Sequence, residues 1–141
     1  MNAPLYNIHI LRLATSIAHQ ERLPDPMGSA EKRSPVCGSS VTVDIDMADG
    51  RVSALGLEVH ACALGQASAS LLAAKAIGRT PGDLAAARDA LTAWLAGEGP
   101  MPDWPGVDVF VPALSVTARH AAIRLAFEAA AEAAAHAGAR A

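Results

Sequence analysis

The chain has 141 residues, of which 52% are hydrophobic and 18% are charged, so it can bury a core and is not disordered by composition. Its 11 basic and 14 acidic residues give a formal net charge of −3, which excludes a strongly basic nucleic-acid-binding face. There is no apolar run of the roughly 20 residues that cross a bilayer, and the N-terminus lacks the pattern of a secretory signal. We therefore expect one soluble, cytoplasmic domain over residues 1–141 that binds neither nucleic acid nor membrane.

The N-terminal part of the chain predicts one helix followed by a connector. Apolar residues recur at helical intervals from residue 4 to about residue 19, which indicates a helix of about four turns. Residues 20–35 are polar and contain several prolines and a glycine, a composition typical of a connecting segment.

Alternating apolar and polar residues then predict a β-hairpin over residues 41–47 and 51–59, with Asp49-Gly50 as the turn signal. A two-residue turn would pair Val43 with Gly56 and direct the apolar residues of the second strand to the wrong face. We therefore predict a three-residue loop that pairs Val43 with Leu55, so that both apolar rows face one core.

The remainder of the chain is predicted to be mainly helical. Small residues dominate residues 62–77, so this helix would let another backbone approach closely. A second helix follows the N-terminal cap at Thr80-Pro81, and an alanine-rich helix runs from 117 to about 136. Between these two helices we predict a loop over residues 97–106 and a short extended segment over 107–111.

Cys37 and Cys62 are the two cysteines, and a cytoplasmic chain of this size does not need a disulfide. In the predicted register residue 37 falls opposite residue 61, so the two thiols lie close together at the open end of the hairpin. Cys62 begins a helix, where exposed amides and the helix dipole favour the thiolate that binds metal or attacks sulfur. We interpret the pair as a functional site; two inert buried thiols are the alternative.

Zinc and iron–sulfur sites usually need four ligands, so the histidines are the next candidates. His120 begins the last helix, where the dipole disfavours imidazolium and leaves a neutral ring able to bind metal. His60 lies two residues before Cys62, but strand alternation turns it away from that thiol. His9 and His19 are placed on the first helix and His136 in the C-terminal tail. Spacing alone leaves the choice between His60 and His120 open.

Other chemical signatures are weak. Asp44 and Asp46 alternate with apolar residues, so we interpret them as a solvated strand face rather than as paired catalytic carboxylates. Ser68 and Ser70 are interpreted as small packing residues. The sequence contains no glycine-rich phosphate loop and no nucleophile elbow.

Residues 34–38 and 61–70, which flank the predicted hairpin, resemble the two cysteine motifs of the U-type iron–sulfur cluster scaffold proteins (the IscU, SufU and NifU N-terminal family). That family has a Pro-x-Cys-Gly-Asp loop, a hairpin, and a Gly-Cys segment that leads into an Ala-Ser-rich helix. The resemblance implies an α+β fold in which a small antiparallel sheet with a β-hairpin packs against several helices, the SufE/IscU-like two-layer arrangement. This chain departs from the family at two positions: Ser39 replaces the aspartate, and Ala121 replaces the third cysteine.

The resemblance implies that Cys37, Cys62 and His120 converge at one exposed end and bind zinc, iron or a transient [2Fe–2S] cluster. Ser39 would be a poor fourth ligand at neutral pH, so water or a partner's side chain is favoured. The implied function is that of a scaffold for iron–sulfur cluster assembly, a carrier rather than an enzyme, working with a cysteine desulfurase and other assembly proteins. Two alternatives stay open: a persulfide acceptor that uses Cys62, and a metal-free adaptor or regulator.

Overall fold

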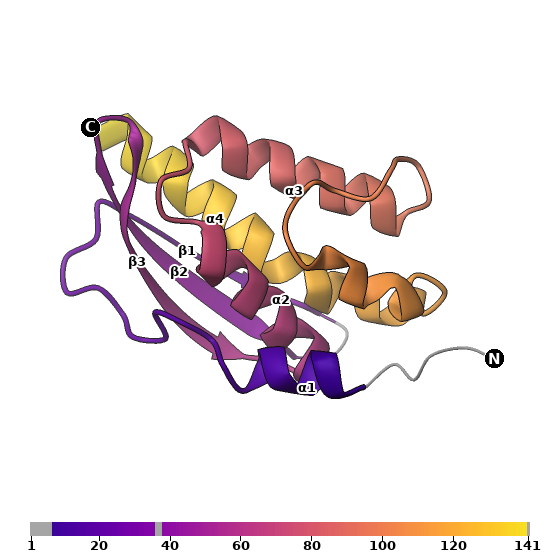
Figure 1. Ribbon diagram of the computed structural model, residues 1–141. Coiled ribbons are helices and arrows are strands. Elements are labelled where there is room, and N and C mark those ends of the chain that lie inside the picture. The colour runs from indigo at the N-terminus through magenta and orange to yellow at the C-terminus, as the bar shows by residue number, and fades with distance from the viewer. Residues whose placement is uncertain (1–6, 36–37, 141) are drawn as a thin grey trace.

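The computed structural model describes residues 7–35 and 38–140 of the chain, so predictions that concern Cys37 lie outside the described residues. A three-stranded antiparallel sheet in the order β1-β2-β3 packs against helices (Figure 1). The elements along the chain are α1 (Ile8–Ala14), β1 (Gly28–Arg33), β2 (Ser40–Ala48), β3 (Arg51–His60), α2 (Ala63–Lys75), α3 (Pro81–Leu95), the 3₁₀ helices η1 (Val107–Ala113) and η2 (Thr117–Arg119), and α4 (His120–Arg140). The predicted α+β fold is confirmed.

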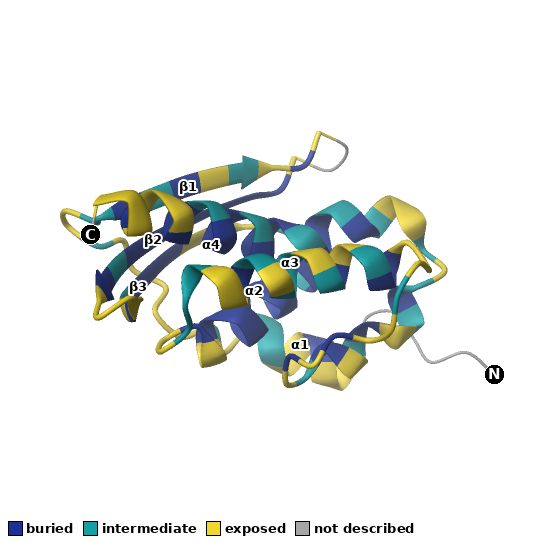
Figure 2. Ribbon diagram, turned by 90° about the horizontal axis from the view of Figure 1, so that it is seen from above, coloured by how far each residue is buried: buried dark blue, intermediate teal, exposed yellow. Residues whose placement is uncertain are grey.

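The core lies between the inner face of the sheet and the long helix α4, with α3 packed over α4 on the far side (Figures 1 and 2). Val41, Val43 and Ile45 of β2 are fully buried, and alanines of α4 are buried along its length. Short alanine side chains let this helix lie close to the strands. None of the helices in the described ranges combines the length and the apolarity needed to span a bilayer.

The β2–β3 hairpin has a two-residue turn, so the predicted three-residue loop is wrong. Ala48 pairs with Arg51, which leaves Asp49 and Gly50 as the turn residues. Both have positive φ angles, 54° and 76°, as a turn that matches the twist of the flanking strands requires. Glycine reaches such angles without steric cost, whereas other residues do so only with strain.

A β-bulge keeps the apolar side chains of this hairpin on one face despite the short turn. The register shifts by one residue after the first two pairs, and Ser53 is left without a partner in β2. Val43 therefore pairs with Leu57 rather than with Leu55, as we had predicted. The expectation that both apolar rows face one core is confirmed, since Leu55 and Leu57 are 4% and 1% exposed.

Helix α1 ends at Ala14 and is shorter than predicted. The hydroxyls of Thr15 and Ser16 donate hydrogen bonds to the carbonyl of Arg12. These bonds satisfy a carbonyl of the last helical turn and compete with the backbone hydrogen bond that would extend the helix. His19 then adopts a φ of 60°, so it lies in the connecting segment and not on the helix, where we had placed it. Hydrophobic spacing alone did not reveal this end.

Strand β1 lies in the segment that we predicted to be a connector. Its inner face carries Gly28, Ala30 and Lys32, so no row of large apolar residues marks it as a strand. Small residues are needed because α4 crosses here: a Cβ added at Gly28 would overlap the backbone oxygen of Ala133. The strand is recognisable only when α4 is in place.

The C-terminal half follows the prediction except before α4. Thr80 and Asp83 form a reciprocal capping box at the start of α3, as the cap signal indicated. We predicted an extended segment over residues 107–111, but these residues belong to the 3₁₀ helix η1. The buried residues Val107, Phe110 and Ala113 recur at every third position, which is the period of a 3₁₀ helix.

Candidate metal centre

The predicted cysteine loop is closed across its base by backbone hydrogen bonds. The amide of Ser34 donates to the carbonyl of Ser39 (2.8 Å), and the amide of Gly38 donates to the carbonyl of Ser34 (3.2 Å). Gly38 has a φ of 71°, a conformation that favours glycine at this position. Cys37 itself, and its predicted position opposite residue 61, lie outside the described residues.

Cys62 is the N-cap residue of α2, as predicted. Its backbone is extended, with φ −65° and ψ 171°, and its carbonyl accepts the hydrogen bond from Gln66 (2.9 Å). The thiol is free and partly exposed, and no side chain caps the helix. The pairing of Ser40 with His60 brings the end of the cysteine loop beside the end of β3, two residues before Cys62.

His120 is the first residue of α4, and its ring is oriented by the backbone. The side chain is 5% exposed, and Nε2 lies 2.9 Å from the carbonyl oxygen of Ala113. Because a carbonyl oxygen can only accept, Nε2 carries the proton, and in the neutral ring Nδ1 keeps a lone pair. Nδ1 has no hydrogen-bond partner among the described residues. Metal-binding histidines typically have one nitrogen held in this way.

The starts of α2 and α4 are in contact. Ser68 donates a hydrogen bond from Oγ to the carbonyl of Ile123 (2.6 Å), and a Cβ added at Gly65 would lie 3.3 Å from the oxygen of Ala122. Figure 1 places both helix starts at the end of the molecule where β1 ends and β2 begins. The structure therefore brings together the two helix starts that carry Cys62 and His120.

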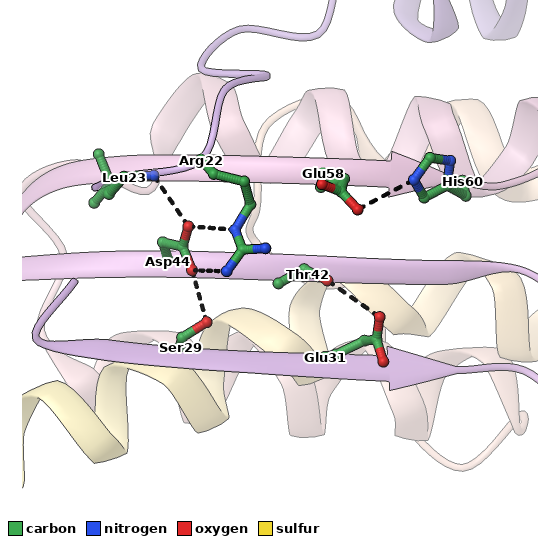
Figure 3. Close-up of polar contacts among 8 residues, drawn as sticks. All are labelled: Arg22, Leu23, Ser29, Glu31, Thr42, Asp44, Glu58 and His60. Carbon is green, nitrogen blue, oxygen red and sulfur yellow. Dashed lines mark hydrogen bonds and ion pairs between the residues drawn. The ribbon is translucent and has the colours of Figure 1, made fainter. Parts of the chain in front are cut away.

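The other histidines lie elsewhere. His60 faces Glu58 on the outer side of the sheet, with 3.2 Å between Nε2 and Oε2, which agrees with the expectation that it turns away from Cys62 (Figure 3). His9 is exposed on α1, and His136 contacts the carbonyl of Ser29 from the last turns of α4, so it is not in a frayed tail. Within residues 7–35 and 38–140 no group of three or more His, Cys, Asp or Glu side chains is placed to hold a metal ion.

Asp44 is not on a solvated strand face, which corrects our interpretation. Its carboxylate is fully buried on the outer side of β2 and pairs with Arg22 at 2.6 Å, while Ser29 and the amide of Leu23 donate further hydrogen bonds (Figure 3). Burial alone would raise the pKa of Asp44, but these hydrogen bonds and the charge of Arg22 outweigh it, so the pKa lies below its usual value. The pair is structural, and Asp46 accepts a separate backbone amide.

No protein-family model and no curated protein matches the chain, but several solved structures are similar to it. A nitrogen-fixing NifU-like protein (N-terminal) from Brucella abortus is 40% identical, with a TM-score of 0.91 over 97% of this chain and 96% of that chain. A protein from Fervidobacterium islandicum AW-1, assigned as an iron–sulfur cluster assembly scaffold of the SUF system, is 16% identical, with a TM-score of 0.79 over 89% and 93% of the two chains. The second likeness concerns the fold alone.

Proposed function

We propose, from the premise that this chain belongs to the U-type scaffold family of NifU-like N-terminal proteins, that it serves as a scaffold for iron–sulfur cluster assembly. The observation that carries the proposal is the contact between the starts of α2 and α4, which bear Cys62 and His120. In this role the protein is a carrier rather than an enzyme, and the cluster or metal ion is its cargo.

The proposed ligands are Cys37, Cys62 and His120. Two sulfur donors and one imidazole nitrogen suit zinc or iron in a [2Fe–2S] cluster. His120 would bind through Nδ1, because Ala113 occupies Nε2. Ser39 is a poor ligand at neutral pH, and water or a partner's side chain would complete the site.

The fold supports a negatively charged site at this end of the molecule. Two helix N-termini meet here, and their partial positive charge stabilises thiolates and a negatively charged cluster. Ala121 stands where the family has its third cysteine, so this chain would hold a cluster more weakly than a three-cysteine scaffold. Weaker retention suits a carrier that must release its cargo to other assembly proteins.

The sulfur in such a cluster must come from another protein, and we propose a cysteine desulfurase as the source. Cys62 is the more accessible of the described candidate ligands, since its thiol is partly exposed while His120 is buried. A thiol at an uncapped helix start is suited to receive sulfur before the cluster forms.

The metal content of the protein purified anaerobically without chelator tests the proposal. We expect about one zinc, or iron with sulfide, per chain in the wild type, and its loss in Cys37→Ser and in Cys62→Ser. Wild-type protein without metal, or a Cys37→Ser variant with undiminished metal, would contradict the proposed site. Sulfur transfer or partner binding would then become the better assignment.

A further inference from the structure

Strand β1 forms one edge of the sheet, and part of its outer side is unpaired (Figure 2). The amide of Ser34 donates to the carbonyl of Ser39, so in the antiparallel ladder Ser34 and every second residue before it direct their backbone groups toward β2. The N–H and C=O groups of Glu31 and Arg33 therefore point away from β2. Within the described parts of the chain these groups have no hydrogen-bond partner, so they are available to another strand.

The side chains of Glu31 and Arg33 give this edge a definite charge pattern. Both lie on the outer face of the sheet, where their exposed fractions are 43% and 69%, and they pair with each other at 3.1 Å. Charged side chains on an edge strand ordinarily prevent pairing with another chain, unless that chain presents opposite charges at the facing positions. A second copy of β1 does so when the two strands run antiparallel about a twofold axis at Lys32. Glu31 of each copy then lies opposite Arg33 of the other.

The neighbouring registers are less favourable. A twofold axis at Glu31 would bring two Glu31 side chains together and would need the carbonyl of Ser29, which already contacts a histidine of α4. An axis at Arg33 would bring two arginines together and place Glu31 opposite Pro35, which has no N–H to donate. The register about Lys32 pairs every free backbone group of Glu31 and Arg33 and opposes unlike charges on the outer face.

The helix-covered side of this edge leaves room for the second copy. A groove of about 370 Å³ lies between β1, α3 and α4, and two of the residues along it, Ala131 and Ala135, have short side chains. The two Lys32 side chains would meet on this side, but each already pairs with Glu132 at 3.2 Å, so its charge is balanced. Neither face of the sheet therefore opposes the pairing.

We propose that two copies of this chain associate through β1 and form one continuous antiparallel sheet. The backbone groups of Glu31 and Arg33 provide the hydrogen bonds, and the two side chains form ion pairs across the interface. The interface is short, so we expect a dimer with a dissociation constant of about 100 µM. This inference goes beyond the proposed function and does not depend on it.

Analytical ultracentrifugation of the full chain, reduced and treated with chelator, tests the interface, because these conditions remove disulfide-linked and metal-bridged dimers. Glu31→Arg and Arg33→Glu each place like charges opposite one another, so each should raise the dissociation constant about tenfold or more. An equimolar mixture of these two variants is complementary again and should form a heterodimer with about the wild-type affinity. Glu98→Arg is the matched control, since it makes the same charge change in an exposed segment after α3 and should dimerise as the wild type does.

The double variant Glu31→Arg/Arg33→Glu restores the complementary pattern within one chain, and it should dimerise like the wild type. A wild-type chain that sediments as a monomer even at about 1 mM would overturn the proposal. So would a Glu31→Arg variant that dimerises as well as the wild type, since another surface would then form the contact. If the mixture and the double variant both stay monomeric, the charge pattern does not set the register and the inference is wrong. None of these outcomes bears on the metal content that tests the proposed function.

Discussion

At the residue scale, the buried charge of Asp44 is held in place by four donors, three from the segment that covers the outer face of β2 and one from the neighbouring strand β1. Arg22 binds the carboxylate with two nitrogens, and Ser29 and the amide of Leu23 supply the others. Removing the charge of Asp44 leaves these donors poorly paired, which is costly because the carboxylate site is closed to water.

We expect Asp44→Asn to lower the free energy of unfolding by about 3 kcal/mol at pH 7, measured by urea denaturation. Asp89→Asn is the matched control, since Asp89 also pairs with an arginine, Arg88, but its side chain is 70% exposed. The control should unfold almost as the wild type does. Equal effects of the two substitutions would show that the Arg22–Asp44 pair is not a strong structural contact.

The same carboxylate predicts a pH dependence. Because its pKa is lowered on folding, its stabilising contribution is complete above the usual aspartate pKa of about 3.9 and is lost as the pH falls through the lowered value. The stability difference between wild type and Asp44→Asn should therefore be constant from pH 5 to pH 7 and shrink below about pH 4. A difference that stays constant down to pH 2 would contradict the lowered pKa.

The histidines offer a third test at this scale. His120→Ala should lose the bound metal, because it removes the one imidazole oriented by a backbone carbonyl at the site. His60→Ala is the control, since His60 lies on the outer face beside Glu58. Metal analysis of both purified variants checks this, and loss of metal from His60→Ala alone would reverse the assignment.

Single residues differ in how well the sequence predicts them. Cys62 and His120 were placed correctly at helix starts, because caps and composition are local signals. Asp44 was misplaced because strand alternation cannot tell which outer positions a loop will cover. Its partner Arg22 lies 22 residues earlier, in a segment without periodicity. The pairing of the cysteine motifs with His120 came from family resemblance and not from spacing.

At the element scale, the close packing of α4 on β1 depends on Gly28. A Cβ at this position would overlap Ala133 and approach the amide of Ala137 to 2.5 Å, so strand and helix would have to separate. We expect Gly28→Ala to destabilise the fold by about 3 kcal/mol, as overpacking against rigid backbone does. Thermal and urea unfolding measure the change.

Gly82→Ala is the control for that substitution. Gly82 lies near the start of α3, where an added Cβ meets only the Thr80 hydroxyl at 3.7 Å. Alanine is the better helix former, so this variant should gain up to about 1 kcal/mol. If Gly28→Ala were as well tolerated as Gly82→Ala, α4 would not lie against β1 as described.

Elements were predictable where their signal is local and strong. The hairpin strands and the start of α3 follow from alternation and capping residues. The hairpin register was not predictable from the apolar pattern. A three-residue loop would place both apolar rows on one face, and so does the observed two-residue turn followed by a bulge at Ser53. Strand β1 escaped prediction because its inner residues are small or charged to suit α4.

At the scale of the whole molecule, the candidate site depends on segments far apart in the sequence. The loop closed by Ser34 and Ser39, the start of α2 and the start of α4 are brought together by the β-ladder and by the contact between the two helices. The unfolded chain does not hold these segments in that arrangement. Metal binding at this end should therefore be linked to global folding.

This linkage predicts the size of a stability change. A ligand that binds only the folded state at a hundred times its Kd adds about 2.7 kcal/mol to the free energy of unfolding. We expect Zn²⁺ to raise the unfolding temperature of the reduced wild-type protein relative to protein in chelator, and Cys37→Ser to show no such rise. An equal rise in the variant would place zinc binding elsewhere on the chain. A shift that depends on both Cys37 and His120 would instead show that the loop and the start of α4 act as one site.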